Sequence, residues 1–436
     1  YFKKKRKMAI KPQIAKNQLK IFVNAYKIVN PVFDSQTKET LKTTKSKFST
    51  KFTIPQSFIN DLVKTEIVQK ILNQSAFKEI QSMTKTDGRK TKRVKVPKLL
   101  DANKAGSKHS KKCTIIFTEG DSAKTMAVAG LSEVGREYYG VFPLRGKIQN
   151  VRGLSNKRVL DCSILNTIKT ILGLKTKKKY KEEYEKTGEW PLRYGRVLLM
   201  TDQDHDGSHI KGLVMNIFDC LWPDLLDMGF ITCMITPIVK AFKKKKEEVF
   251  YTLHDYETWK ESNPTKGWRI KYYKGLGTST TKEAKEYFKN LNIIEYYLQD
   301  EHANNLDLAF NSDKADDRKT WLGSYDRSVI PDYKQERITF DDFVDQELIH
   351  FSNADNNRSI PNMMDGLKPS TRKILFASFK RKLIHEIKVA QLSGYTSEHS
   401  AYHHGEVSLE NTIKNMAQDF VGANNINYLE PIGQFG

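Results

Sequence analysis

The sequence predicts a multidomain protein of mixed α/β and α+β class, organised around a parallel β-sheet. Two apolar, strand-like segments, one at Val197–Met200 and one within Cys113–Ala123, lead directly into acidic residues. Parallel strands of α/β folds present their ligand-binding groups at their carboxyl ends in this way. A polar, basic stretch over 84–112 separates these strands from a helical N-terminal region, and a different composition begins near residue 345. Three or more structural parts are therefore expected.

Composition favours a nucleic-acid partner. The chain has 436 residues, with 73 Lys and Arg against 51 Asp and Glu, which gives a net charge of +22. Such an excess of cations is typical of proteins that neutralise phosphates, although a solubilising surface gives the same count. The four cysteines lack the spacing of a metal knuckle or of a disulfide framework, which indicates a reducing compartment. No apolar segment reaches membrane length, so no membrane partner is expected.

The N-terminal region combines a strand-like and a helical pattern. Gln18–Val29 alternates apolar and polar residues as a strand does, and Ile54–Ile80 carries apolar residues at helical spacing. Between them, Gln36 and Lys38 flank a threonine and could reach a phosphate. The basic run Lys3–Lys7 is compatible with a nuclear signal or with an ordinary basic loop, and the sequence leaves both open.

Three aspartates, Asp202, Asp204 and Asp206, follow the strand Val197–Met200 at alternate positions. Side chains two residues apart in an extended segment lie on one side, where their charges repel unless a cation neutralises them. A hard divalent metal is the natural partner, although a solvated turn or a helix N-cap uses the same residues. The pattern also resembles an EF-hand calcium loop. That loop needs a Glu at its twelfth position, which here is Leu213, and a helix before it, so the calcium loop is excluded.

Glu119 supplies a fourth carboxylate from the segment Cys113–Ala123, whose sequence is CTIIFTEGDSA. If the two strands share one parallel sheet, Glu119 can complete a magnesium site with Asp202 and Asp204. A strand followed by EGDSA, together with a strand followed by DQDHDG, resembles the Toprim domain. That domain is the metal-binding fold of topoisomerases and primases.

Basic residues accompany the predicted metal site. Arg145, Lys147 and Arg152 surround a glycine-containing turn and form a predicted basic rim. A phosphodiester requires both features, a cation for its developing charge and basic side chains for its neighbours. A further strand is predicted at Trp268–Ser279, ending in a glycine-rich turn, and a surface helix at Ala284–Gln299.

The C-terminal part predicts a helix-turn-helix-like DNA-binding module. An amphipathic helix is expected from about Thr371, and another over Val407–Phe420. The basic face of the first carries Arg372, Lys373 and Lys380. A basic amphipathic helix also suits a membrane surface, but compact helices joined by a small-residue turn favour DNA. The pair His403 and His404 is compatible with zinc ligation, catalysis or phosphate contact, and no further Cys or His at suitable spacing supports zinc.

The chain as a whole resembles the central part of the eukaryotic-type DNA topoisomerase II family. The matching segments are, in order, NPVFDSQTKE, FTEGDSA, PLRGKIQNVRG, LLMTDQDHDGSHIKGL, KYYKGLGTS, SIPNMMDGLKPSTRKILF, AYHHGE and NNINYLEPIGQFG. The resemblance implies the C-terminal part of the ATPase transducer domain over 1–95 and a basic linker over 96–111. It then implies a Rossmann-like Toprim domain over 112–240, a Toprim extension and linker over 241–344, and the winged-helix part of the DNA breakage-reunion domain over 345–436.

The resemblance also implies roles for individual residues. Metal ligands would be Glu119, Asp202, Asp204 and Asp206, holding two Mg²⁺ ions, with Mn²⁺ or Ca²⁺ as substitutes. Gln36 and Lys38 match the pair that touches the γ-phosphate of ATP. Glu119, Arg372 and His404 correspond to catalytic positions. The implied DNA contacts are Arg145, Lys147, Asn150, Lys274, Arg372, Lys373, Lys380 and His403.

The activity implied by the resemblance is ATP-dependent. A homodimer makes a Mg²⁺-assisted, transient break in both strands of duplex DNA through a 5′-phosphotyrosine, passes a second duplex and religates, in a nucleus or in a viral factory or virion. The family's nucleophilic tyrosine follows GQFG, and none of the nineteen tyrosines here stands in that motif. The GHKL ATP-binding core would precede Tyr1. The chain as given is therefore expected to bind metal and DNA without completing cleavage. Another Toprim enzyme, such as a nuclease or primase, and a DNA-binding fragment without activity are the alternatives.

Overall fold

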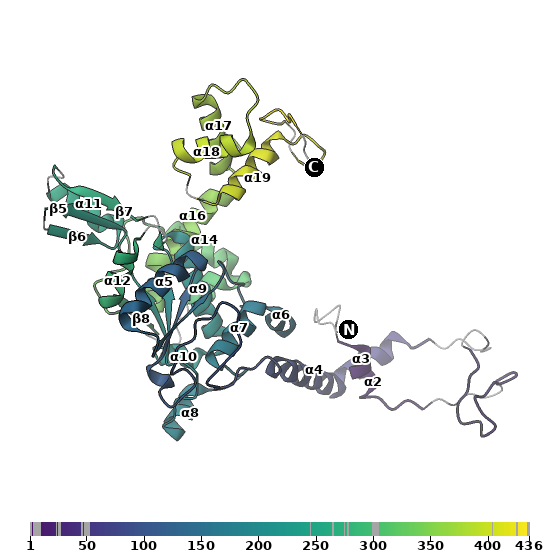
Figure 1. Ribbon diagram of the computed structural model, residues 1–436. Helices are drawn as coiled ribbons and strands as arrows, with labels where there is room; N and C mark the ends of the chain where they lie inside the picture. The colour runs from purple at the N-terminus through teal and green to yellow at the C-terminus, as the bar shows by residue number, and fades with distance from the viewer. Residues whose placement is uncertain are drawn as a thin grey trace. The chain divides into compact units, whose positions relative to one another are not determined.

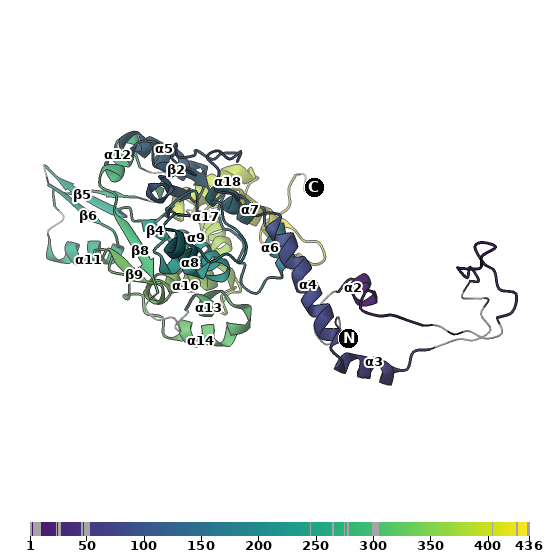
Figure 2. The same ribbon diagram turned by 90° about the horizontal axis from the view of Figure 1, so that it is seen from below.

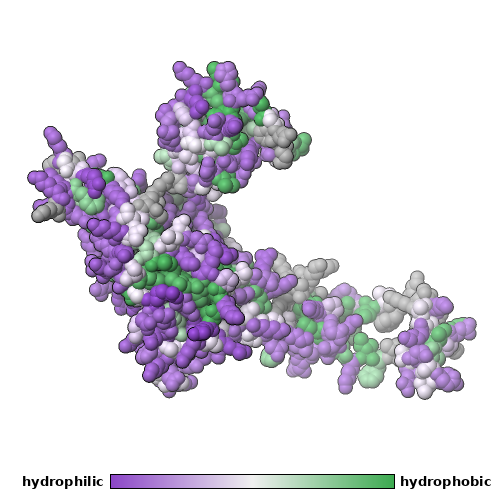
Figure 3. All heavy atoms as spheres, in the orientation of Figure 1, coloured by the Kyte–Doolittle hydropathy of each residue, from purple (hydrophilic) through white to green (hydrophobic). Residues whose placement is uncertain are grey.

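The computed structural model describes residues 2, 10–22, 24, 28–44, 47, 53–244, 246–263, 266–273, 275, 276, 279–298, 305–402, 404–423 and 426–433. They form two compact units, of which unit 1 comprises Tyr1–Arg89 and Leu154–Thr176 and unit 2 comprises Lys90–Gly153 and Lys177–Gly436 (Figure 1). Hydrophilic residues cover most of the face seen in Figure 3. No helix within the described ranges is long and apolar enough to span a membrane.

Unit 1 is built from helices. They are α2 (Pro12–Lys16), α3 (Gln56–Lys64), α4 (Ile67–Thr84), α6 (Asn156–Asp161) and α7 (Ser163–Leu172). The helix predicted over Ile54–Ile80 is therefore two helices. They separate at Thr65, whose backbone is extended and whose hydroxyl donates to the carbonyl of Leu62.

The strand predicted over Gln18–Val29 is wrong for the described residues of that range, none of which belongs to a strand. An alternating segment becomes a strand only when a neighbour pairs with its backbone groups. The described part of unit 1 provides only an isolated bridge between Phe33 and Leu41. Ile21 and Phe22 accordingly stay exposed.

Unit 2 is centred on a six-stranded sheet in the order β2-β1-β3-β4-β8-β9. The strands are β1 (Thr114–Thr118), β2 (Tyr139–Pro143), β3 (Arg196–Met200), β4 (Ile231–Met234), β8 (Ile293–Tyr297) and β9 (Arg337–Thr339). The first four run parallel, β8 is antiparallel to β4, and β9 is parallel to β8. The predicted fold class, with a central parallel sheet, is confirmed. The apolar runs of β1 and β3 are buried, as strands covered on both faces must be.

Helices connect and cover this sheet. They are η2 (Ser110–Lys112), α5 (Asp121–Val134), α8 (Tyr180–Thr187), α9 (His205–Leu221), α10 (Pro223–Asp227) and α12 (Thr281–Lys289). Helix α5 follows β1 and α9 follows β3, so both begin at the carboxyl edge of the sheet. The surface helix predicted over Ala284–Gln299 is wrong beyond Lys289, because its second half forms β8. The β-branched and aromatic residues IIEYY pair with β4 there.

A smaller sheet follows in the order β6-β5-β7. It consists of β5 (Val239–Lys243), β6 (Lys246–Phe250) and β7 (Arg269–Tyr272), with α11 (Leu253–Ser262) between β6 and β7. Phe250, Tyr256 and Trp259 form its aromatic core. The strand predicted at Trp268–Ser279 is present but ends at Tyr272.

The C-terminal part of unit 2 is helical. Its elements are α13 (Asn305–Phe310), η4 (Ser312–Lys314), α14 (Ala315–Gly323), α15 (Phe340–Asp342), η5 (Phe343–Leu348), α16 (Ile349–Ser359), α17 (Pro369–Lys380), α18 (Val389–His399) and α19 (Glu406–Ala417). The last three pack around Ile374, Leu392 and Leu409, so the predicted basic helix and the predicted final helix both exist, within two or three residues of their expected limits. Segment η5 is a π-helix that no sequence pattern indicated.

Candidate metal and nucleic-acid site

The two acidic segments meet at the carboxyl edge of the sheet. Thr118 lies opposite Met200, so the residues that follow β1 and β3 emerge side by side. The backbone N–H of Asp202 donates to Glu119 Oε2 at 3.4 Å. The juxtaposition expected for two neighbouring parallel strands is therefore present.

Asp202 is also held from the opposite direction by a glycine-containing turn. The backbone N–H of Leu276 donates to Asp202 Oδ1 at 2.7 Å. Gly275 precedes it at φ +139°, and a Cβ built there would lie 2.4 Å from Asp202 Oδ2. Only glycine allows the turn to approach the carboxylate this closely.

Asp204 begins α9. Its Oδ1 accepts a bond from the backbone N–H of Gly207 at 2.7 Å, which makes it the N-cap. A Cβ on Gly207 would fall 2.0 Å from the carbonyl oxygen of Asp202, so this glycine lets the acidic turn fold back on itself. The N-cap interpretation of the motif is thus correct for Asp204. It does not exclude metal binding, because the carboxylate retains a second oxygen.

The carboxylates lack a compensating charge within their group. Burial raises the pKa of Glu119 to about 7, and the negative charges of Asp202 and Asp204 add to the effect. Burial also raises the pKa of Asp202, in opposition to the bond from Leu276. Hard oxygen donors with unfavourable mutual repulsion fit a divalent cation such as Mg²⁺. Among the described residues, no three acidic, imidazole or thiol groups already converge as a metal shell, so coordination of one ion requires these side chains to turn towards each other.

Asp206, in the first turn of α9, lies between two cations. Its carboxylate is 2.8 Å from Lys147 Nζ and 3.1 Å from an Arg358 guanidinium nitrogen. Burial alone would raise the pKa of Asp206, but hydrogen bonds and charge from Arg358 and Lys147 lower it to about 2. The predicted second-ion ligand is therefore held by basic side chains in this structure. The sequence does not single out Arg358, which is one more cation in the last turn of a helix.

The turn after β2 supplies the basic rim. The backbone N–H groups of Leu144 and Gly146 donate to the carbonyls of Thr118 and Glu119, which places the turn against the end of β1. Arg145, between them, is exposed and has φ +64°. Arg145 and Lys147 therefore border the carboxylates.

Arg152 and Asn150 take a different part. The guanidinium of Arg152 bonds to Asp219 and Asp307, and its Nε donates to Asn216. The amide of Asn150 donates to the carbonyl of Phe310 at 2.8 Å and accepts from Asn216. Both side chains are engaged within the fold, so Arg152 adds little to the predicted basic rim. The DNA contact expected of Asn150 stays a prediction.

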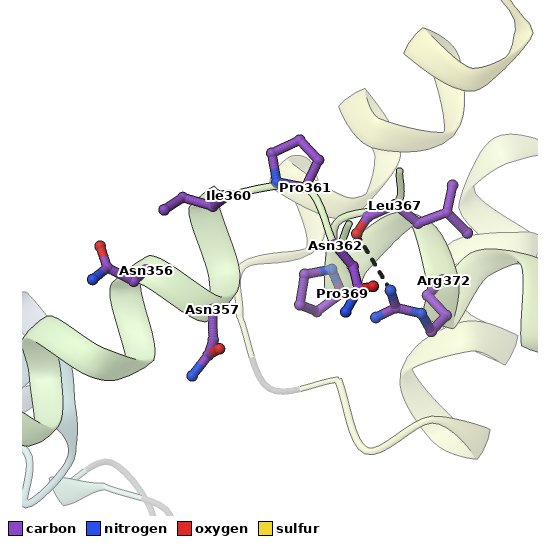
Figure 4. A pocket seen from close by; sticks show the side chains of 8 residues that line it. All are labelled: Asn356, Asn357, Ile360, Pro361, Asn362, Leu367, Pro369 and Arg372. Atoms are coloured by element: carbon purple, nitrogen blue, oxygen red, sulfur yellow. Dashed lines mark hydrogen bonds between the residues drawn. The ribbon is translucent and has the colours of Figure 1, made fainter. Parts of the chain in front are cut away.

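A polar hollow of about 410 Å³ lies between the end of α16 and the start of α17 (Figure 4). Arg372 and three asparagine side chains contribute to its lining, and Arg372 donates to the carbonyl of Leu367. The Arg372 guanidinium also makes a bidentate pair with Asp365, at 2.8 and 2.9 Å. This pair keeps the pKa of Asp365 below its usual range.

The remaining predicted residues lie elsewhere. Lys373 Nζ donates to the carbonyl of Ala401, and the Lys380 ammonium lies 5.9 Å from the Phe376 ring centre. The His404 ring packs edge-on against Tyr402. In unit 1, Gln36 and Lys38 lie in an exposed turn, where the backbone N–H of Lys38 donates to Ser35. Lys274 and His403 fall outside the described residues.

Comparison with known proteins identifies the family. Residues 114–232 match the Toprim domain, residues 234–356 match the C-terminal associated domain of TOPRIM, and residues 358–436 match the A-type polypeptide of DNA gyrase/topoisomerase IV. The whole chain is 49% identical to DNA topoisomerase 2 of Plasmodium falciparum and 50% identical to DNA topoisomerase 2-alpha of Homo sapiens. The chain belongs to the DNA topoisomerase 2 family.

A solved structure of the same family agrees. The crystal structure of the Plasmodium falciparum topoisomerase II DNA-binding, cleavage and re-ligation domain is 51% identical, with a TM-score of 0.69. The match covers 79% of this chain and 47% of that one. The chain spans 31% of the Plasmodium topoisomerase 2 and 29% of the human one, so it corresponds to a central region of these proteins.

The topoisomerase domains divide the candidate residues among them. Glu119, Asp202, Asp204 and Asp206 all fall in the Toprim match, whose presence points to use of a divalent metal. Arg358, Arg372 and His404 fall in the segment matched to DNA gyrase/topoisomerase IV. The Asp206–Arg358 ion pair thus joins two topoisomerase domains within unit 2. Gln36 and Lys38 lie outside all three matches.

Proposed function

We propose that this chain is the central part of an ATP-dependent type II DNA topoisomerase. The reaction is Mg²⁺-assisted, transient cleavage of both strands of a duplex through a 5′-phosphotyrosine, passage of a second duplex and religation. One observation carries the proposal: Glu119, Asp202 and Asp204 form a group of repelling carboxylates bordered by Lys147 and Arg358. A phosphodiester suits that boundary, because it needs a metal at its oxygens and cations at its neighbouring phosphates.

Glu119, Asp202 and Asp204 would hold the Mg²⁺. When bound, the ion would stabilise the negative charge that develops on the phosphate oxygens. Lys147 and Arg358 hold Asp206, and a DNA phosphate offers both of them another anion. Asp206 would then be released, which is compatible with its predicted part in binding a second ion.

The proposal extends to the partners. Arg372 would contact the DNA backbone from the hollow beside α17, and His404 would lie near the scissile phosphate. Gln36 and Lys38 would reach the γ-phosphate of ATP, with 1–95 as the end of the transducer and 96–111 as the linker. The active form would be a homodimer, located in a nucleus or in a viral factory or virion. The names of the relatives, and their identity over the whole chain, support these assignments.

Asp204→Asn tests the metal site without removing the helix cap. Asparagine caps a helix as well as aspartate does, so the start of α9 should keep its bond from Gly207 while one charged ligand is lost. We expect the Mg²⁺ or Mn²⁺ affinity of the 436-residue chain, measured by calorimetry, to fall about tenfold or more, with little change in thermal midpoint.

The matched control is Glu137→Gln. Glu137 is an exposed carboxylate bonded to Asn103 and Lys104, at the opposite end of β2 from the basic turn. This variant should bind metal and DNA as the unmodified chain does. Equal metal affinity in Asp204→Asn and Glu137→Gln would contradict the proposed site.

A plasmid assay with Mg²⁺ and ATP tests the activity itself. Linking-number changes in steps of two, made by a polypeptide that includes this chain, would establish double-strand passage. The 436-residue chain alone should retain DNA on a gel and form no covalent adduct. Nicking without strand passage would overturn the topoisomerase assignment in favour of a Toprim nuclease.

A further inference from the structure

Three contacts join α9 to the segment formed by η5 and α16, which lies beside it in both ribbon views (Figures 1 and 2). Lys211 pairs with Glu347 at 2.8 Å, and Asp206 pairs with Arg358 at 3.1 Å. Between them, the His209 ring stacks on Phe351 with centroids 3.9 Å apart. As the residue number falls along α9, it rises along α16. The two segments therefore run antiparallel, and we call these three contacts the α9–α16 ladder.

The ladder is buried at one end and open at the other. The side chains of Lys211 and Glu347 are 1% and 7% exposed, whereas those of Arg358 and Asp206 are 36% and 28% exposed. Only the first pair is therefore shielded from competing ions and water. The open pair lies at the candidate site, where a phosphate or a metal can exchange with its partners.

The buried end is saturated with hydrogen bonds. Ser208 Oγ donates to Glu347 Oε1 at 2.7 Å, and Tyr296 from β8 donates to Glu347 Oε2 at 3.4 Å. Burial would raise the pKa of Glu347, yet the Lys211 charge and these donors lower it. Burial would likewise lower the pKa of Lys211, and Glu347 raises it. Both groups thus stay charged inside the fold, and removal of one would leave the other without a partner.

The backbone adapts to this pair. Glu347 belongs to the π-helix η5, in which Phe343, Val344 and Leu348 are also buried. A π-turn contains more residues than an α-turn and is less favourable, and such turns are frequent at functional sites. Here the wide turn immediately precedes α16, so it sets the point along α9 at which α16 begins.

We propose that the buried Lys211–Glu347 pair is a positioning element that fixes the lengthwise register of α16 against α9, and so places Arg358 at Asp206 and Phe351 beneath Lys147. The inference rests on the proposed function, which it deepens. Lys147 Nζ lies 4.9 Å from the Phe351 ring centre, a cation–π contact that steadies the ammonium beside Asp206. A slip of one helical turn would move Arg358 by about 5.4 Å and break both contacts. Buried polar pairs are best attested in this kind of register role, since apolar residues of equal volume stabilise a core as well.

The double variant Lys211→Met/Glu347→Leu separates register from stability. It removes both charges and keeps most of the volume, so the thermal midpoint should change by only a few degrees. A spin label at the end of α16 (Ser359→Cys) and one on α5 (Val128→Cys), in a Cys220→Ser background, then report the register. We expect the distance distribution to broaden or to shift by about 5 Å, one helical turn.

Metal binding provides a second readout with a defined sign. If α16 slips, Arg358 leaves Asp206 and the site loses one positive charge. The Mn²⁺ affinity of the 436-residue chain should then rise about two- to fourfold in the double variant, and by a similar factor in Arg358→Gln. A double variant with unchanged label distances and unchanged Mn²⁺ affinity would overturn the proposal and leave the pair a stabilising contact only.

Two further variants complete the test. Lys240→Met removes another lysine that is only 3% exposed and ion-paired, on β5, and should leave the α5–α16 distance unchanged. Glu347→Gln keeps the side-chain size and the bond from Ser208, and it serves if the double variant fails to fold. It should shift the labels as the double variant would, and unchanged labels in it would count equally against the proposal. The label distances require neither metal nor DNA. An unmodified chain that bound no Mn²⁺ would therefore count against the proposed function, while the register would still be measured.

Discussion

Gly275 passes so close to Asp202 that a side chain cannot fit between them, and replacing it tests how the metal site is assembled. A Cβ at residue 275 would lie 2.4 Å from Asp202 Oδ2 and 2.8 Å from its Cγ. The next residue, Leu276, holds the other oxygen of the same carboxylate at 2.7 Å. In Gly275→Ala the methyl group and the carboxylate compete for one position, so Asp202 must rotate away from Leu276.

The magnitude follows from two costs. A non-glycine residue at φ +139° is strained by about 1–3 kcal/mol. Losing a hydrogen bond to a charged group costs about 1.5–3 kcal/mol. The carboxylate can relieve the clash by turning, so we expect the free energy of unfolding to fall by only about 1–3 kcal/mol. Metal affinity should fall further, by about 10–100-fold, because a misdirected ligand no longer serves the ion.

Calorimetric titration of the 436-residue chain with Mg²⁺ or Mn²⁺ checks this expectation. Gly135→Ala is the matched control, since Gly135 also has a positive φ, +77°, but no atom lies within 4 Å of its added Cβ. The control should lose stability and keep its metal affinity. If Gly275→Ala bound metal as tightly as Gly135→Ala, the reasoning that Asp202 is a ligand positioned by this turn would be refuted.

Three further predictions concern stability and DNA. Burial would raise the pKa of Glu283, but bonds from Lys271 and neighbouring donors lower it to about 2. Glu283→Gln should therefore cost about 3 kcal/mol at neutral pH, a difference that urea denaturation should find lost as pH falls from about 4.5 through 2. Gly130→Ala places a Cβ 2.1 Å from the Phe288 ring and should lower the free energy of unfolding by about 2 kcal/mol, seen as a reduced thermal midpoint. Arg372→Gln should weaken DNA binding for all sequences alike and reduce the slope of affinity against salt by about one, measured by fluorescence anisotropy.

The sequence was sufficient for the part of the site that depends on local spacing. Asp202, Asp204 and Asp206 follow one strand at alternate positions, and Glu119 follows its parallel neighbour, so a general rule about strand ends brought them together. Periodicity was less reliable where pairing decides the outcome. The residues IIEYY suit a helix face or a strand, and only the free edge of β4 selects the strand.

The cations that complete the site could not be found by the same means. Arg358 and Asp206 are 152 residues apart, and Lys211 and Glu347 are 136 apart, so no local pattern links either pair. A cation in the last turn of a helix is ordinarily explained by the helix dipole, and Arg358 satisfies that description in α16. Its contact with Asp206 follows from the register of two antiparallel segments, one of which begins with a π-turn. Local chemistry therefore identifies the acidic half of the site, whereas its basic half depends on the packing of α16 against α9, which the buried Lys211–Glu347 pair is positioned to fix.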